Sequence, residues 1–157
     1  MKKMKVLVVF YSRTGTTRKL AEFLSKKLEA EVDEIIDLKK RNGPIGYMIA
    51  GKDATLKRET KIRFKKDPEK YDLVIIGTPI WAWTITPAVR AYLNQNKENL
   101  KEKKLAFFCT MGGSGDKGAF SEMEKLTHKS ISYLALTTKE VIKEEFNKVK
   151  EFLRKLR

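Results

Sequence analysis

The sequence has one cysteine, Cys109, and one histidine, His128, among its 157 residues. A single cysteine excludes a disulfide within the chain and a metal cluster held by several cysteines. Cys109 precedes a glycine-rich loop, where a nucleophile would suit, but no Cys-x5-Arg phosphate cradle follows it, and a packed core thiol is the favoured interpretation. His128 has no second ligand or triad partner, which favours a surface position. We therefore expect no catalytic side chain and no metal site.

Long apolar runs are absent as well. No stretch approaches the ~20 apolar residues that a membrane-spanning helix needs. The apolar run after the lysines at positions 2, 3 and 5 is short and strand-like, and no small-residue cleavage site follows it. We expect a cytoplasmic protein without membrane contact, folded as one domain over residues 1–157.

Acidic residues are few relative to basic ones. The chain has 34 Lys and Arg against 20 Asp and Glu, a formal net charge of +14. Acids and bases are interleaved along most of the chain, which favours a solvated surface of the kind found in heat-stable proteins. Docking of an acidic partner protein is the first alternative, and nucleic-acid binding is a lesser one. We expect no specific nucleic acid and a monomer or weak homodimer.

Apolar segments alternate with segments that carry apolar residues at helical spacing. The predicted strands cover residues 5–11, 31–38, 71–79, 104–110 and 130–137. Helical patterns follow the first, third and fourth of them, and residues 139–157 form one amphipathic pattern. This alternation predicts an α/β fold, with a parallel sheet that carries helices on both faces and is joined by right-handed crossovers.

The stretch SRTGTT joins the first predicted strand to the first predicted helix. A helix N-terminus binds anions, because its first N–H groups lack partners and carry partial positive charge. Glycine here lets the backbone approach a ligand closely. One hydroxyl residue would suffice to cap the helix, so four of them in six residues favour a phosphate site. The candidate phosphate residues are Ser12, Arg13, Thr14, Gly15, Thr16 and Thr17.

The connections after the third and fourth predicted strands should meet this loop at the carboxyl edge of the sheet, where ligands bind. The earlier connection holds both tryptophans of the chain, Trp81 and Trp83. One of them can pack into the core, but two in one loop favour stacking of a flat heteroaromatic ligand. The later connection is rich in glycine, which suits close approach to a ring edge. The candidate ring residues are Thr78, Pro79, Ile80, Trp81, Ala82 and Trp83, and Thr110, Met111, Gly112, Gly113, Ser114, Gly115 and Asp116.

Taken with these three loops, the sequence resembles the flavodoxin family over essentially the whole chain. The resemblance rests on the segments YSRTGTT, GTPIWAWTITPAVRAYL and FFCTMGGSGD. It implies a three-layer sandwich with a five-stranded parallel sheet of order 2-1-3-4-5. It also implies noncovalent binding of FMN and a role as a flavodoxin that shuttles electrons between redox partners.

Two features depart from the family pattern. Thr16 stands where many flavodoxins have asparagine, and its hydroxyl can replace that hydrogen bond. Flavodoxin carriers are typically acidic, whereas this chain is basic, which implies acidic redox partners or another role. An FMN-dependent NAD(P)H or quinone reductase is the first alternative. A regulatory domain without flavin on the same fold is the second, although Phe10, Tyr11 and Ser12 stand where a receiver domain needs acids.

Overall fold

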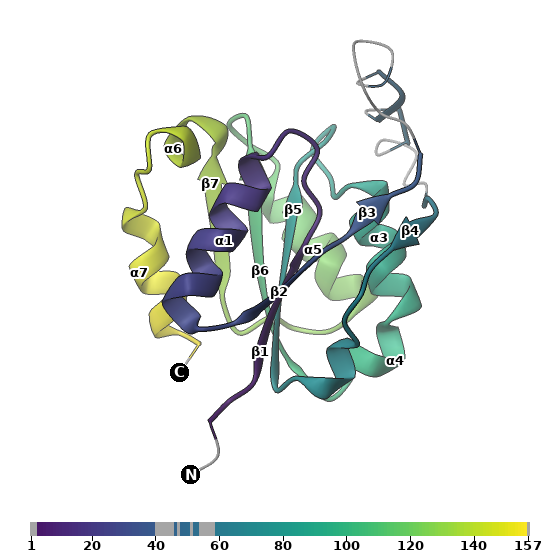
Figure 1. Ribbon diagram of the computed structural model, residues 1–157. Helices are drawn as coiled ribbons and strands as arrows, with labels where there is room; N and C mark the ends of the chain where they lie inside the picture. Colours follow the sequence, from purple (N-terminus) through teal and green to yellow (C-terminus); the bar gives the residue numbers. More distant parts are fainter. Residues whose placement is uncertain (1–2, 40–45, 47, 51, 54–58, 157) are drawn as a thin grey trace.

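Five parallel strands form the central sheet, in the spatial order β2-β1-β5-β6-β7 (Figure 1). The computed structural model describes residues 3–39, 46, 48–50, 52–53 and 59–156. The strands of this sheet are β1 Val6–Phe10, β2 Glu31–Glu34, β5 Leu73–Pro79, β6 Lys104–Met111 and β7 Tyr133–Thr137. Because β3 (Ile36–Asp37) and β4 (Ile62–Arg63) pair only with each other, the winding is the predicted 2-1-3-4-5 order. The predicted fold class is confirmed.

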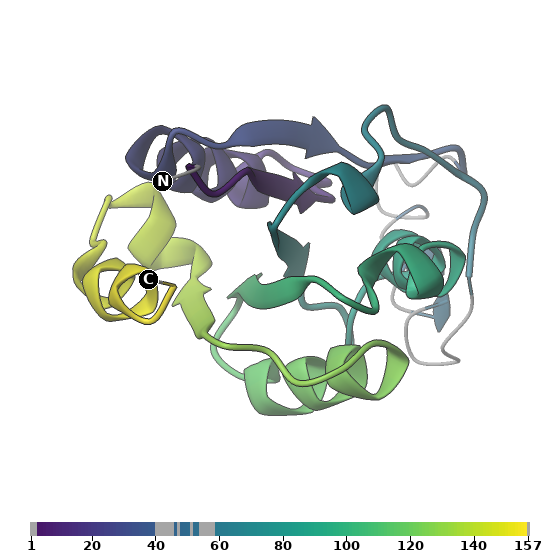
Figure 2. The ribbon, with the colours of Figure 1, turned by 90° about the horizontal axis from the view of Figure 1, so that it is seen from below.

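Helices cover both faces of the sheet, as Figure 2 shows. One face packs against α1 (Thr16–Leu28), α6 (Thr138–Ile142) and α7 (Asn147–Arg154), and the other against α3 (Pro87–Gln95) and α5 (Asp116–Leu126). Two short elements, η1 (Pro68–Lys70) and α4 (Lys97–Leu100), lie in the connections that precede β5 and β6. Among the described residues, no helix combines the length and apolar character needed to cross a bilayer.

Neighbouring residues of each inner strand belong to opposite hydrophobic clusters. Val8 and Ile75 pack with α1, while Val9 and Ile76 pack with α3 and α5, and all four are fully buried. Successive side chains of a strand point to opposite faces, so a strand covered on both faces must be apolar at every position. This explains the continuous apolar runs in the sequence.

The predicted second strand, residues 31–38, is divided in the structure. Glu34 ends β2, although the N–H of Ile35 still donates to the carbonyl of Phe10 at 2.7 Å. Ile36 then leaves the sheet to pair with β4, and its side chain is 44% exposed. The prediction of one strand was wrong, because pairing partners rather than composition decide where a strand ends.

The amphipathic pattern predicted over residues 139–157 is divided between two helices, α6 and α7, rather than forming one. Glu144 has a left-handed φ of 57° and separates α6 from α7. The break allows Phe146 to pack on Phe23 of α1, with 4.4 Å between ring centroids. Ile142, which belongs to the predicted apolar stripe, is 65% exposed as a result.

Candidate functional site

A cavity of about 270 Å³ lies where β1, β5 and β6 end, beside the start of α6. All three predicted loops contribute to its wall. The lining residues are Arg13, Thr14, Thr16, Thr17, Pro79, Ile80, Trp81, Thr110, Met111, Gly112 and Thr138. The topology therefore brings together residues that are separated by more than sixty positions in the sequence.

The first loop has the shape of an anion cradle. Gly15 adopts a φ of 101°, and its N–H donates to Ser12 Oγ at 3.0 Å. The first helical bond runs from Lys19 N to the Gly15 carbonyl, and no side chain caps α1. The N–H groups of Thr16 and Thr17 are thus not bonded to any residue that the structure describes. No acidic residue lies in the first turn, so the helix dipole favours an anion here.

The hydroxyl groups of this loop have different surroundings. Thr14 and Thr16 both line the cavity, with 3.5 Å between their Oγ1 atoms. The hydroxyl of Thr17 is instead engaged at 2.7 Å with that of Thr110, and both side chains are buried. This bond ties the first loop to the end of β6. Thr14 and Thr16 are therefore the hydroxyl residues best placed to meet an anion.

Two arginines lie near the cradle, and only one lines the cavity. Arg18 donates to both carboxylate oxygens of Glu34, at 2.9 Å and 2.6 Å. These bonds raise the pKa of Arg18 and direct its guanidinium toward β2. Arg13 lines the cavity itself, so it is the cation placed for a bound anion.

The second loop forms a tight hairpin turn. Trp81 N donates to the Thr84 carbonyl at 3.0 Å and Thr84 N to the Trp81 carbonyl at 3.1 Å. Both central residues have positive φ, 50° at Ala82 and 62° at Trp83, which defines a type I′ turn. Trp81 packs edge-on against Tyr11, with 5.6 Å between centroids, and lines the cavity. Trp83 is 73% exposed and lies outside the lining.

We expect Ala82→Asn to raise the free energy of unfolding by about 0.5–1 kcal/mol, because asparagine tolerates the left-handed region better than alanine does. Urea denaturation would measure the change. Ser114→Asn is the matched control, since Ser114 is exposed and has no positive φ, and it should leave stability unchanged. An equal effect of both substitutions would contradict strain at Ala82.

The third loop is bonded to the second. The carbonyl of Thr110 accepts from Ile80 N at 2.9 Å. Gly115 has a φ of 107°, and a Cβ built on it would lie 2.8 Å from Ile80 Cγ2 and 3.1 Å from Trp83 Cα. Gly112 lines the cavity and has nothing within 4 Å of its Cβ position. The second and third loops are therefore joined to each other and face the first loop across the cavity.

Ten of the candidate residues line the cavity and nine do not. Ser12 and Gly15 shape the first turn, and the buried hydroxyl of Thr78 donates to the Pro79 carbonyl at 2.8 Å. The remaining candidates lie on the turn, in the exposed part of the third loop, or at the start of α5. These are Ala82, Trp83, Gly113, Ser114, Gly115 and Asp116.

Thr138 is the lining residue that sequence reasoning missed. It begins α6, directly after β7, and its hydroxyl donates to the Met111 carbonyl at 3.3 Å. The signal was available, because β7 neighbours β6 and its carboxyl end lies at the same edge of the sheet. The predicted site included only the connections after the first, third and fourth predicted strands.

Cys109 lies within β6 and is fully buried. Burial raises the pKa of its thiol, which suppresses the reactive thiolate.

We expect a disulfide reagent such as DTNB to modify Cys109 at least about a hundredfold more slowly in the folded chain than in urea. Equal rates of modification in the folded chain and in urea would contradict the burial of Cys109.

Among the described residues, no group of three His, Cys, Asp or Glu side chains could hold a metal ion.

Comparison with known proteins gives concordant results. A family profile described as "Flavodoxin domain" matches residues 47–142. The flavodoxin-like domain-containing protein BilS of Clostridioides difficile (strain CD3) is 31% identical over 125 residues, which cover 78% of this chain and 56% of BilS. The chain thus spans a little over half the length of that relative.

Solved structures share the fold. A flavoprotein from Lactobacillus acidophilus NCFM, in complex with FMN, has a TM-score of 0.73 at 24% identity, covering 90% of this chain and 98% of that one. A putative flavoprotein from Bacteroides eggerthii DSM 20697 has a TM-score of 0.69 at 24% identity, covering 94% and 99%. At these identities the likeness shows a common fold.

Proposed function

This chain belongs to the flavodoxin domain family, and from that premise we propose that it binds FMN noncovalently and carries electrons between redox partners. The observation that carries the proposal is the cavity in which an anion cradle, an aromatic wall and a glycine loop meet. FMN has a phosphate at one end and a flat ring at the other, so its two ends match the two ends of this site. The FMN complex of the Lactobacillus acidophilus flavoprotein adds support from a protein of similar fold.

The residues present fit both ends of the cofactor. The unbonded N–H groups of Thr16 and Thr17, the hydroxyls of Thr14 and Thr16, and the cation of Arg13 would hold the phosphate. The ring would contact Trp81 and the backbone of Gly112, where no side chain fills the space. When bound, the flavin supplies storage for one or two electrons, while the protein orients it and excludes water.

The redox partners are proposed to be acidic proteins. The net charge of +14 creates a positive field that speeds association with a negatively charged surface. Association rates should therefore fall as ionic strength rises. A carrier with a negative surface would favour basic partners instead. The sign of the net charge therefore predicts the sign of the partner's surface.

A second candidate function is a reductase that reacts directly with NAD(P)H or a quinone. Gly112 and Gly113 are exposed, with open space around both Cβ positions, and residues 111–115 contain no aromatic side chain. A ring held against Trp81 would thus lack an aromatic cover from the third loop. A second flat molecule could then approach the ring, as hydride transfer requires.

Reconstitution with FMN tests both candidates. We expect a yellow protein with one FMN per chain and quenched tryptophan fluorescence, because Trp81 lines the cavity. Anaerobic mixing with NADH or NADPH then separates them. If NADH or NADPH reduces the bound flavin only when a partner reductase is added, the carrier is supported. Rapid reduction of the flavin without a partner supports the reductase. Failure to bind FMN would overturn both.

A further inference from the structure

β7 lies at one edge of the sheet, and its outer side is open. Phe107 N donates to the Ser132 carbonyl at 3.1 Å, in a register that pairs Phe107 with Tyr133. Peptide groups of successive strand residues point to alternate sides, so those of Leu134 face β6 while those of Tyr133 and Ala135 face outward. No residue that the structure describes is hydrogen-bonded to these outward groups.

The opposite edge of the sheet is protected. Three of the four residues of β2 are acidic. The carboxylate of Asp33 accepts from the N–H groups of Lys65 and Lys66 at 2.7–3.2 Å, which holds that segment against the strand. Charged residues and covering segments are common means of blocking strand addition. β7, with the sequence YLALT, has neither a charge nor a proline, and no described segment is bonded along its outer side.

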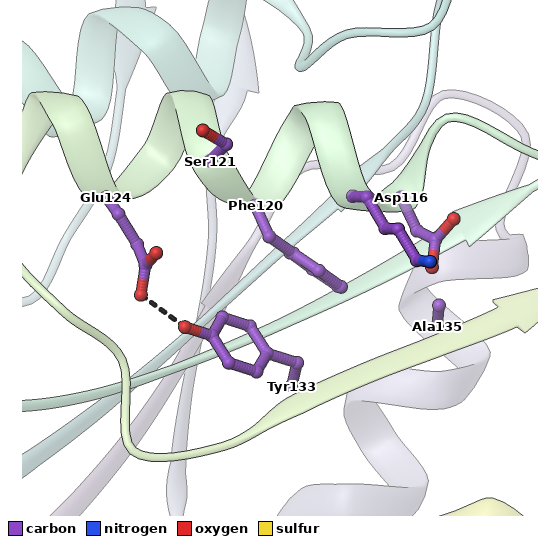
Figure 3. Close-up of a pocket in the computed structure, with 7 residues that line it drawn as sticks. Asp116, Phe120, Ser121, Glu124, Tyr133 and Ala135 are labelled. Atoms are coloured by element: carbon purple, nitrogen blue, oxygen red, sulfur yellow. Dashed lines mark hydrogen bonds between the residues drawn. The ribbon is translucent and has the colours of Figure 1, made fainter.

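A groove of about 400 Å³ lies between β7 and α5, beside this open edge (Figure 3). Its lining residues are Asp116, Lys117, Phe120, Ser121, Glu124, Tyr133 and Ala135. The rings of Phe120 and Tyr133 lie 5.3 Å apart and form an apolar wall. In Figure 3 the Tyr133 hydroxyl points to Glu124 and donates a hydrogen bond to it, and Glu124 also accepts from Ser130 N at 2.9 Å. These bonds hold the wall in place without a ligand.

We propose that the β7 edge and the α5–β7 groove together bind an extended acidic segment of another protein, which adds to the sheet as a further strand. In strand addition, main-chain hydrogen bonds supply affinity and alternate side chains occupy pockets beside the edge. Tyr133 and Ala135 offer the main-chain groups. Tyr133, 42% exposed, and Ile131, 38% exposed, offer apolar surface next to them.

The overall charge of the chain favours an acidic occupant of this surface. The groove itself is lined by one lysine, Lys117, and by two carboxylates, Asp116 and Glu124, of which Glu124 is hydrogen-bonded to Tyr133 and Ser130. Two further lysines, Lys125 and Lys129, are exposed along α5 and its connection to β7. None of these three lysines has an ion pair with a residue that the structure describes. A second copy of this chain would also carry a charge of +14 and be repelled, whereas an acidic segment would be attracted.

The surface adjoins the cavity described above but does not depend on it. Asp116 lines the groove and directly follows Gly115 of the third loop. A protein bound at β7 would therefore lie beside the candidate FMN site. Binding itself requires only the strand edge and the groove, so it is expected with or without FMN.

Two short synthetic peptides test the proposal, one alternating valine with glutamate and the other alternating valine with lysine. Binding to the full chain is followed by the NMR shifts and hydrogen exchange of its amides. We expect the glutamate peptide to shift and protect the amides of Tyr133 and Ala135. The lysine peptide should bind at least about tenfold more weakly.

Substitutions on the chain sharpen the test. Ala135→Pro removes an outward N–H without removing a bond to β6. It should lower the affinity for the glutamate peptide at least about tenfold. Ala135→Ser keeps the N–H and is the matched control. If Ala135→Pro does not fold, Lys117→Glu carries the test, because it should shift the preference toward the lysine peptide.

Three results would overturn the proposal. The first is equal binding of both peptides, and the second is binding that leaves the amides of Tyr133 and Ala135 unaffected. The third is protection of these amides at high protein concentration without peptide, which would assign the edge to a second copy of the chain.

Discussion

Replacing Thr14 and Thr16 together by alanine is expected to weaken FMN binding by at least about a hundredfold, because a hydrogen bond to a charged group is worth about 1.5–3 kcal/mol. Both residues line the cavity, and among the residues that the structure describes their hydroxyls are hydrogen-bonded only to each other. Removing them should leave the helix intact, since neither hydroxyl caps α1. Isothermal titration with FMN measures the loss.

Riboflavin provides the control ligand, because it has the same ring but no phosphate. Its affinity should be lower than that of FMN for the unmodified chain and should change little in the Thr14→Ala, Thr16→Ala variant. Thr127→Ala is the matched protein control, since that hydroxyl donates to the Met123 carbonyl at the far end of α5. Equal losses for FMN and riboflavin would mean that the first loop shapes the protein without binding phosphate.

The sequence predicts the hydroxyl-rich loop but not the roles of its members. Thr16 and Thr17 are neighbours of the same type, yet one lines the cavity with Thr14 and the other is buried against Thr110. That difference depends on the rotational phase of α1 and on a strand ninety-three positions away. Local pattern therefore identifies the loop, while tertiary contacts decide which hydroxyl is available.

The same limit applies to the fold. The inner strands could be predicted because strands buried on both faces have continuous apolar runs, whereas their order was implied only by the resemblance to the flavodoxin family. The break between α6 and α7 could not, because the apolar spacing continues through Glu144, whose φ of 57° ends α6. The hairpin turn at Ala82 and Trp83 carries none of the Asn-Gly signals of a type I′ turn. In both places packing holds a conformation that local preference disfavours.

Packing between the second and third loops explains how the turn at Ala82 and Trp83 keeps its conformation. Gly115 allows the backbone of Trp83 and the side chain of Ile80 to approach the third loop closely. The bond from Ile80 N to the Thr110 carbonyl adds a second connection. A substitution at Gly115 should therefore affect the shape of the cavity wall as well as the stability of the chain.

Gly115→Ala is expected to lower the free energy of unfolding by about 2–5 kcal/mol, from the strain of an L residue at positive φ and from overpacking. The added Cβ would lie 2.8 Å from Ile80 Cγ2 and 3.1 Å from Trp83 Cα, so the turn must move. Since Ile80 and Trp81 line the cavity, FMN affinity should fall at least about tenfold. Gly113→Ala is the matched control, because nothing lies within 4 Å of its Cβ position and its φ is not positive. Urea denaturation and FMN titration of both variants measure the two effects. A Gly115→Ala protein that loses stability but keeps full FMN affinity would show that the turn does not form part of the cofactor site.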